Sequence, residues 1–316
     1  MDRASRRQFI QLAGGAFAMG LTPAAAAASA QAPSQASPLS KTQQLRALLR
    51  RQGMVIAPEG YTVISAKLAE AHGFEAIYIG GSMMCGTYLG VPDWGLLTPT
   101  AMVDIAGRIA REVSIPAIVD ADHGGETALN VYHTVQQYEK AGIAALHIED
   151  TLNPKHADQR GAAVSLQSPE RMAVRIRAAV DARSDPDFVI IARSDEADLD
   201  ALIRRGNAYA EAGADVYMPR QVTPETIDRI AGEVPIPLLG VSLPFPEVRD
   251  TRLKVNVYAN LLSGPATALC DTLLRELKEN GEVLRTPERR LEGEMATRLR
   301  NGATYTELSE RWTATS

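Results

Sequence analysis

The chain of 316 residues is poor in cysteine, in aromatic residues and in excess positive charge. Its two cysteines, Cys85 and Cys270, exclude a framework of several disulfides. The sequence leaves a single bridge open, but both residues lie in apolar runs, so we expect buried thiols. Aromatic residues make up only 5% of the chain and alanine is abundant, which favours a helix-rich α/β protein. The formal net charge of −5 offers no basic surface for nucleic acid.

The chain also lacks a convincing membrane span. Its N-terminal apolar stretch, residues 12–28, is interrupted by Gly, Thr and Pro. That stretch follows the twin-arginine pattern Ser5-Arg6-Arg7-Gln-Phe9-Ile10 and precedes Ala28-Ser29-Ala30, a small-x-small cleavage site. We interpret residues 1–30 as an export signal and expect a periplasmic protein without stable membrane association. The alternative is a disordered alanine-rich leader. Residues 31–39 have the composition of a flexible linker.

The remainder, residues 40–316, is regularly patterned. A capping box at Ser40 predicts an additional helix before the first strand. Three glycines, Gly73, Gly142 and Gly213, each stand between a helix end and an apolar strand, at a spacing that fits two βα units between neighbours. We expect strands at residues 54–57, 75–79, 116–120, 144–148, 188–192, 215–218, 237–241 and 255–258. Eight strands alternating with helices predict a single (β/α)₈ TIM-type barrel with a C-terminal helical extension from about residue 264. A doubly wound open sheet is disfavoured because no Gly-rich phosphate motif follows the first strand.

Carboxylates follow two of these strands where each one ends. Asp120 and Asp122 end the apolar run that starts at Ile115, and Glu149 with Asp150 ends the next strand. Like charges placed side by side are tolerated chiefly where a cation neutralises them. Oxygen ligands of this kind suit Mg²⁺, so we expect a metal site at the carboxyl ends of the strands. The alternative is that these acids are helix caps or loop charges.

Two further strand ends suit an anionic ligand. Gly80, Gly81 and Ser82 allow a ligand to approach the backbone closely and to accept hydrogen bonds from its N–H groups. Arg193 ends another apolar strand and can bind a carboxylate through two parallel hydrogen bonds. The alternative for Arg193 is a structural ion pair with Asp195 or Glu149.

Five motifs stand in order between about residues 43 and 280: Tyr78-Ile-Gly-Gly-Ser82, Val91-Pro-Asp93, Asp120-Ala-Asp-His-Gly124, His147-Ile-Glu-Asp150 and Ile191-Ala-Arg-Ser-Asp195. Together they resemble the isocitrate lyase/phosphoenolpyruvate mutase superfamily. The resemblance implies a (β/α)₈ barrel that binds 2-oxo acids or their enolates with Mg²⁺, or Mn²⁺ in its place. It implies a metal contact for Asp122, and contacts mostly through waters for Asp93, Asp120 and Glu149. It further implies roles in the substrate pocket or the reaction for Gly80, Gly81, Ser82, Arg193, Tyr78, Asn260 and Glu149.

The chain departs from that pattern in the loop after Asp150. Members that cleave 2-hydroxy acids carry a cysteine there as proton donor, and phosphonate-handling members carry an Asn-Ser pair. Residues 153–161 have neither. His123, with residues 128–131 and 141–145, instead resembles the oxaloacetate decarboxylase branch. We therefore expect Mg²⁺-dependent decarboxylation of a small 2-oxo dicarboxylate, oxaloacetate first.

Several alternatives to this expectation stay open. One is a lyase acting on a 2-hydroxy acid of the 2-methylisocitrate or dimethylmalate type, and another is a non-catalytic periplasmic 2-oxo-acid binding protein. For the final proton, water or a nearby acid such as His123 or His156 would serve, although His123 could equally be a partner of Glu149. We expect His147 to be packed inside the barrel.

Family resemblance also implies a homotetramer in which the helix after strand eight packs on a neighbouring subunit. We place that helix at Thr267–Asn280, on the basis of its leucines at 269, 273, 274 and 277. The alternative is that it folds back on its own barrel. The aperiodic loop at residues 151–164 lies over a strand end and fits a lid.

Overall fold

The computed structural model describes residues 38–153, 155, 165–283 and 291–313. The expected export signal, most of the linker, His156 and most of the expected lid lie outside these residues. Among the helices that are described, none is long and apolar enough to cross a bilayer.

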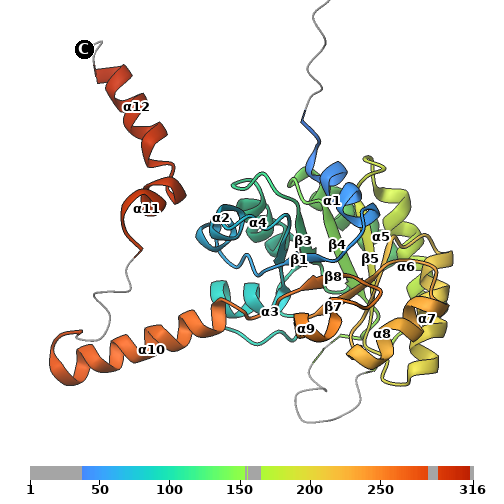
Figure 1. Cartoon of the computed structure of the whole chain (residues 1–316). Helices are drawn as coiled ribbons and strands as arrows, with labels where there is room; N and C mark the ends of the chain where they lie inside the picture. The colour runs from blue at the N-terminus through green and yellow to red at the C-terminus, as the bar shows by residue number, and fades with distance from the viewer. Residues whose placement is uncertain (1–37, 154, 156–164, 284–290, 314–316) are drawn as a thin grey trace, which may run out of the picture. The chain divides into compact units, whose positions relative to one another are not determined.

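Eight parallel strands form the centre of the molecule, as the sequence pattern predicts (Figure 1). Their order is β1-β8-β7-β6-β5-β4-β3-β2. Each strand from β3 to β7 is therefore hydrogen-bonded to both of its sequence neighbours, and β8 is hydrogen-bonded to β7 and β1. The strands are β1 (Val55–Ala57), β2 (Ile77–Ile79), β3 (Ala117–Asp120), β4 (Ala145–Glu149), β5 (Val189–Ser194), β6 (Val216–Pro219), β7 (Leu238–Val241) and β8 (Leu253–Val257). Each lies within two residues of its expected bounds.

A single bridge nearly closes the barrel between β1 and β2. Glu59, just after β1, pairs in parallel with Tyr78 of β2. The Tyr78 N–H donates to the Pro58 carbonyl at 2.9 Å, and the Gly60 N–H donates to the Tyr78 carbonyl at 2.8 Å. The (β/α)₈ prediction is therefore confirmed, and the open doubly wound sheet is excluded.

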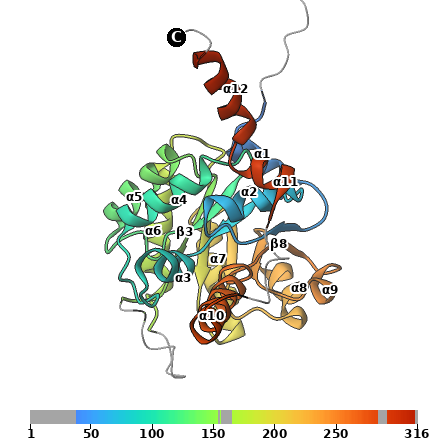
Figure 2. The same ribbon diagram turned by 90° about the vertical axis from the view of Figure 1, so that its left-hand side faces the viewer.

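Helices surround the strands on the outside (Figures 1 and 2). Three of them begin as their N-cap–proline pairs predict, with Thr98, Ser168 and Thr223 as N-caps. The glycines at 73, 142 and 213 have positive φ values of 82°, 81° and 98°, the left-handed conformation that ends a helix. The helices are α1 (Lys41–Arg50), α2 (Val63–Ala71), α3 (Gly81–Met84), α4 (Pro99–Ala110), α5 (Ala128–Lys140), α6 (Pro169–Ala182), α7 (Leu199–Glu211), α8 (Pro224–Glu233), α9 (Phe245–Val248), α10 (Ser263–Asn280), α11 (Gly293–Leu299) and α12 (Gly302–Thr313), with a π-helical turn η1 (Cys85–Leu89) after α3.

The additional helix α1 closes the amino-terminal end of the barrel. Leu45 and Leu48 belong to the apolar cluster inside the barrel, and both are buried. Arg46 donates to Asp215, which precedes β6, at 2.8 Å, and to the carbonyl of Phe188, which precedes β5, at 3.1 Å. With this end filled, the carboxyl ends of the strands are left to form a site.

Helix α10 begins at Ser263, four residues earlier than the sequence suggests, because Glu59 anchors its start. The buried Glu59 carboxylate accepts hydrogen bonds from the N–H and hydroxyl groups of Ser263 and from the N–H of Leu262. A carboxylate there is also stabilised by the helix dipole. Beyond this anchor most of α10 is exposed. The expectation of two buried thiols is half wrong. Cys85 is buried in η1, whereas Cys270 is an exposed free thiol, because most of α10 is not covered by other described residues.

Candidate active site

Strand alternation directs the predicted polar side chains into the barrel. In β4, Leu146 and Ile148 pack outward against helices, so Ala145, His147 and Glu149 face inward. The same alternation turns three further polar residues inward: Tyr78 of β2, Asp120 of β3 and Arg193 of β5.

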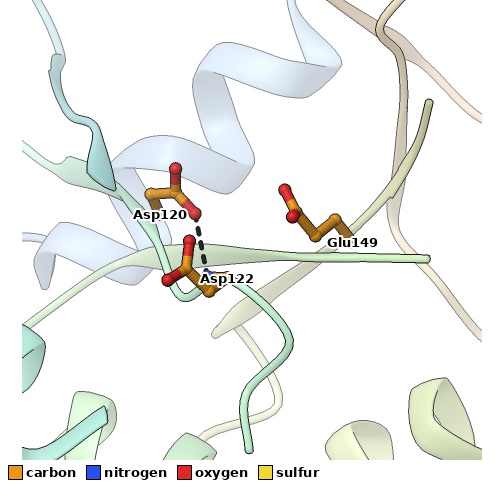
Figure 3. Close-up of side chains that lie close together, drawn as sticks. All are labelled: Asp120, Asp122 and Glu149. Carbon is orange, nitrogen blue, oxygen red and sulfur yellow. Dashed lines mark hydrogen bonds between the residues drawn. The ribbon is translucent and has the colours of Figure 1, made fainter. Parts of the chain in front are cut away.

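Three carboxylates meet at the carboxyl ends of β3 and β4 (Figure 3). Asp120, Asp122 and Glu149 each offer an oxygen atom within 4.8 Å of the others. Asp122 lies beyond the end of β3 rather than on it, with a φ of 49° that few non-glycine residues adopt. Its N–H donates to Asp120 Oδ1 at 2.9 Å and its carbonyl accepts from the Glu149 N–H at 2.9 Å. This strained turn holds the Asp122 carboxylate close to the other two.

The electrostatics of these buried acids differ from one another. Burial, together with neighbouring Asp120, raises the pKa of Asp122 to about 8. Burial acts in the same direction on Glu149, but the charges of Arg193 and Lys155 outweigh it and hold the pKa of Glu149 well below its usual range. Burial also raises the pKa of Asp93, whose Oδ1 is buried without a hydrogen bond among the described residues.

The charges of this cluster favour a divalent cation. Lys155 Nζ lies 3.0 Å from Glu149 Oε1 and 3.7 Å from Asp93 Oδ1, and it contacts Asp122. Arg193 Nη1 lies 2.7 Å from Glu149 Oε2. These two cations face four acids: Asp93, Asp120, Asp122 and Glu149. The all-oxygen donor set fits Mg²⁺ or Mn²⁺, with Asp120, Asp122 and Glu149 as the residues that would hold it, and a bound cation would favour the ionised form of Asp122.

Gly81 has a second use that the sequence does not reveal. Its N–H, expected to hold a substrate carboxylate, donates to Asp120 Oδ2 at 3.0 Å. A Cβ atom at Gly81 would lie 3.0 Å from that same oxygen, so a side chain there would displace Asp120. Ser82 follows in the first turn of α3, where backbone N–H groups lack intrahelical acceptors and can face a ligand.

Arg193 forms ion pairs with both Glu149 and Asp195, the structural partners considered in the sequence analysis. Besides Glu149, it donates to Asp195 through Nε at 2.8 Å and through Nη2 at 3.1 Å. These contacts hold the guanidinium beside the carboxylate cluster, with its side chain 16% exposed. The position serves ion pairing within the chain and can also face a ligand.

Thr151 connects His123 to Glu149, a role that the sequence analysis missed. The Thr151 hydroxyl donates to Glu149 Oε1 at 2.6 Å, so it can only accept at its 3.0 Å contact with His123 Nε2. The proton of neutral His123 therefore lies on Nε2, and burial lowers the pKa of this imidazole. His123 is thus a partner of Glu149 through Thr151. In the sequence, this contact could have been predicted from the hydroxyl of Thr151, which stands two residues after the strand-end carboxylate Glu149.

Tyr78 and His147 fill the barrel below the carboxylates. The Tyr78 hydroxyl lies 3.1 Å from His147 Nε2, and the two rings stack with centroids 5.9 Å apart. His147 Nδ1 lies 3.6 Å from Asp120 Oδ1. Burial raises the pKa of Tyr78 well above its usual value, which keeps the phenol neutral. His147 is packed in the barrel as expected, with its Nδ1 near Asp120 but not hydrogen-bonded to it.

Two further predicted residues lie away from the cluster. Asp150 turns outward and accepts hydrogen bonds from Ser194 at 2.6 Å and Tyr209 at 2.7 Å, so its role is structural. Asn260, with a φ of 54°, lines a groove of about 820 Å³ together with Ser82 and residues of η1 and α10. The structure thus brings Ser82 and Asn260 to one surface, and none of the clustered carboxylates lines that groove.

Comparison with known proteins finds relatives of the superfamily that the sequence motifs resemble. A family model described as phosphoenolpyruvate phosphomutase matches residues 45–271. An oxaloacetate decarboxylase of Pseudomonas aeruginosa is 40% identical over 222 residues, covering 68% of this chain and 77% of that protein. A 2-methylisocitrate lyase of Aeropyrum pernix is 36% identical over 250 residues, covering 75% and 80%. A 2,3-dimethylmalate lyase of Eubacterium barkeri is 39% identical over 201 residues, covering 62% and 69%.

Solved structures similar to this chain come from the same superfamily. A phosphoenolpyruvate phosphomutase from Streptomyces platensis superposes with a TM-score of 0.79 at 31% identity, covering 86% of this chain and 99% of that one. A phosphonopyruvate hydrolase in complex with oxalate and Mg²⁺ gives a TM-score of 0.76 at 29% identity, covering 87% and 100%. The chain therefore belongs to the phosphoenolpyruvate mutase/isocitrate lyase superfamily, whose members include lyases, mutases and hydrolases of small carboxylates.

Proposed function

We propose that the protein is a Mg²⁺-dependent carbon–carbon lyase that decarboxylates a small 2-oxo dicarboxylate, with oxaloacetate as the first candidate. The observation that carries the proposal is the carboxylate cluster of Asp120, Asp122 and Glu149 beside Arg193, in a chain that offers no suitable thiol. The similarity to an oxaloacetate decarboxylase supports it, although lyases for other substrates are similar to a comparable degree.

Neither cysteine of the chain suits the role of proton donor to a leaving enolate. Cleavage of a 2-hydroxy acid in this superfamily relies on a cysteine in the loop after Asp150, and residues 151–164 contain none. Cys270 is exposed on α10. Cys85 is buried, and burial together with Asp93 and Asp122 raises the pKa of its thiol to about 12, which disfavours loss of its proton. Decarboxylation needs no such donor, because carbon dioxide leaves and the enolate takes its proton from water.

The chain's own residues have distinct tasks in this reaction. A bound Mg²⁺ would supply Lewis-acid chemistry by withdrawing electrons from the 2-oxo acid. The Arg193 guanidinium is placed to stabilise the negative charge that develops on the substrate oxygen, an effect typically worth a few kcal/mol. First-turn N–H groups of α3, such as that of Ser82, suit the substrate carboxylate. Neutral His123 orients Glu149 through Thr151.

The experiment that tests this function is a turnover panel in buffer containing Mg²⁺. We expect the protein to convert oxaloacetate to pyruvate and carbon dioxide, and to leave 2-methylisocitrate, 2,3-dimethylmalate and phosphonopyruvate unchanged. Pyruvate is followed with a coupled dehydrogenase, and the slow spontaneous decarboxylation of oxaloacetate is subtracted with a blank containing Mg²⁺ alone. Cleavage of either branched acid in preference to oxaloacetate would replace the proposed substrate by a 2-hydroxy acid. Tight oxalate binding without turnover of any compound would identify a binding protein instead.

We also propose that α10 packs on a second copy of the chain. Its apolar side chains Leu269, Leu274 and Leu277 are 39%, 66% and 48% exposed, and apolar side chains that are exposed together often mark an interface with another protein. Burying such a face against a partner removes it from water without disturbing the barrel.

Light scattering tests this assembly. We expect the wild-type protein to be a discrete oligomer, a tetramer by family resemblance, and a variant with all three leucines replaced by Gln to shift to smaller species. Leu129→Gln, at an exposed leucine on α5, is the matched control and should keep the wild-type mass. A wild-type protein that is a monodisperse monomer would contradict the proposal.

A further inference from the structure

Lys155 occupies the centre of the carboxylate cluster, where the mechanism gives it no task. Its Nζ contacts Asp122 Oδ1 and lies 3.0 Å from Glu149 Oε1, so it bridges two of the three carboxylates that could hold a metal. The side chain is only 9% exposed. Burying an ammonium group this deeply is unfavourable unless acids compensate it.

The surrounding charges explain why the ammonium group is stable there. Lys155 Nζ contacts Asp122, lies 3.0 Å from Glu149 Oε1 and lies 3.7 Å from Asp93 Oδ1, so three acids compensate the buried charge. The carboxylates in turn would repel one another without a cation between them. Lys155 therefore does in this structure what a metal ion would do: it neutralises Asp122 and Glu149 at short range.

We propose that Lys155 is the resident cation of the metal-free site, and that a divalent metal must displace its ammonium group from Asp122 and Glu149 in order to bind. This inference rests on the proposed metal-dependent function. An ion bound to Asp122, with Glu149 bound directly or through a water, would occupy the space between the two carboxylates in which the ammonium group lies, so the two states exclude each other. The pairing stabilises the metal-free barrel and lowers the apparent metal affinity, which scales with the fraction of molecules in which Lys155 is unpaired.

Chemical labelling of lysine measures the displacement directly. The protein is treated briefly with an amine-acylating reagent with and without saturating Mn²⁺, and the modified lysines are quantified by mass spectrometry. We expect Mn²⁺ to raise the labelling rate of Lys155 about tenfold, because release exposes a paired and buried amine. Lys67 is the internal control: it is ion-paired with Glu112 at 2.9 Å and its side chain is 11% exposed, but it lies on α2, away from the cluster. Its rate should not change.

A binding measurement separates this inference from the proposed function. Free Mn²⁺ is followed by electron paramagnetic resonance for the wild type and for Lys155→Met, which retains the length of the side chain without its charge. We expect the variant to bind Mn²⁺ about tenfold more tightly, since no ammonium group competes.

The outcomes are distinct. If Mn²⁺ binds to the wild type but labelling of Lys155 is unchanged or slower, the ammonium group stays in place and the inference is wrong, whereas the metal site stands. If neither the wild type nor Lys155→Met binds Mn²⁺, the metal-dependent function fails and the inference fails with it.

Discussion

Replacing Asp122 by Asn should lower kcat/KM for oxaloacetate by about a thousandfold, which corresponds to roughly 4 kcal/mol of lost transition-state stabilisation. Asn is chosen over Ala because residue 122 has a φ of 49°, a conformation that Asn tolerates well. The N–H donated to Asp120 is also retained. What the variant loses is a carboxylate that can ionise when a cation binds, and with it most of the affinity of the cluster for that cation.

The measurement is steady-state kinetics across a range of Mg²⁺ concentrations, with circular dichroism to confirm the fold. Glu126→Gln is the matched control, because Glu126 is an exposed acid near the site that bonds Asn153 and is no part of the carboxylate cluster. It should keep nearly full activity. Equal activity of Asp122→Asn and wild type, together with wild-type activity that survives EDTA, would contradict the metal site.

The barrel was predictable because its signals are local and repeated. The strands are marked by apolar runs of four to six residues, and several helices by N-cap–proline pairs at the start or a glycine at the end. All eight strands fall close to their expected positions. The alternation of side chains along a strand then decides which polar residues enter the barrel. Asp120, Glu149 and Arg193 meet in the structure for that reason.

Contacts made outside the strands were less predictable. Glu149 and Asp150 are adjacent acids, yet only Glu149 faces the site. Asp150 turns outward and accepts hydrogen bonds from Ser194 and from Tyr209 of α7. Lys155 enters the cluster from a loop without periodicity, so no pattern marks its place. Cys270 was expected to be buried because apolar residues surround it in sequence. Burial depends instead on what covers a helix, which sequence periodicity does not show.

Replacing Arg193 should distinguish a ligand-binding guanidinium from a purely structural ion pair. Arg193→Lys keeps a positive charge near Glu149 but loses the planar fork that holds Asp195 through two nitrogens. We expect kcat/KM for oxaloacetate to fall about a hundredfold, because the ammonium group of lysine stabilises the negative charge developing on the substrate less well than the guanidinium group does. The free energy of unfolding should change by no more than about 1–2 kcal/mol.

Arg193→Met should have a larger effect on stability. Glu149 is fully buried, and removing its 2.7 Å partner leaves Lys155, at 3.0 Å, to compensate the carboxylate charge alone among the described residues that pair with it. Loss of one partner of a buried pair typically costs about 3–5 kcal/mol, and the remaining contact with Lys155 should hold the loss near the lower end of that range. Urea denaturation with EDTA present, so that no divalent cation compensates Glu149, would detect it.

Asp195→Asn supplies the comparison that decides between the two roles of Arg193. It weakens the second ion pair of Arg193 while leaving both Arg193 and its contact with Glu149 in place. If Arg193 acts on the substrate, Arg193→Lys should lose far more activity than Asp195→Asn at a similar loss of stability. If Arg193 is only structural, the two variants should lose stability in parallel, and the folded fraction of each should keep wild-type kcat/KM. The ratio of kinetic loss to unfolding free energy, measured for both variants under one condition, therefore assigns the role, because a structural ion pair cannot change the reaction barrier without first changing the fold.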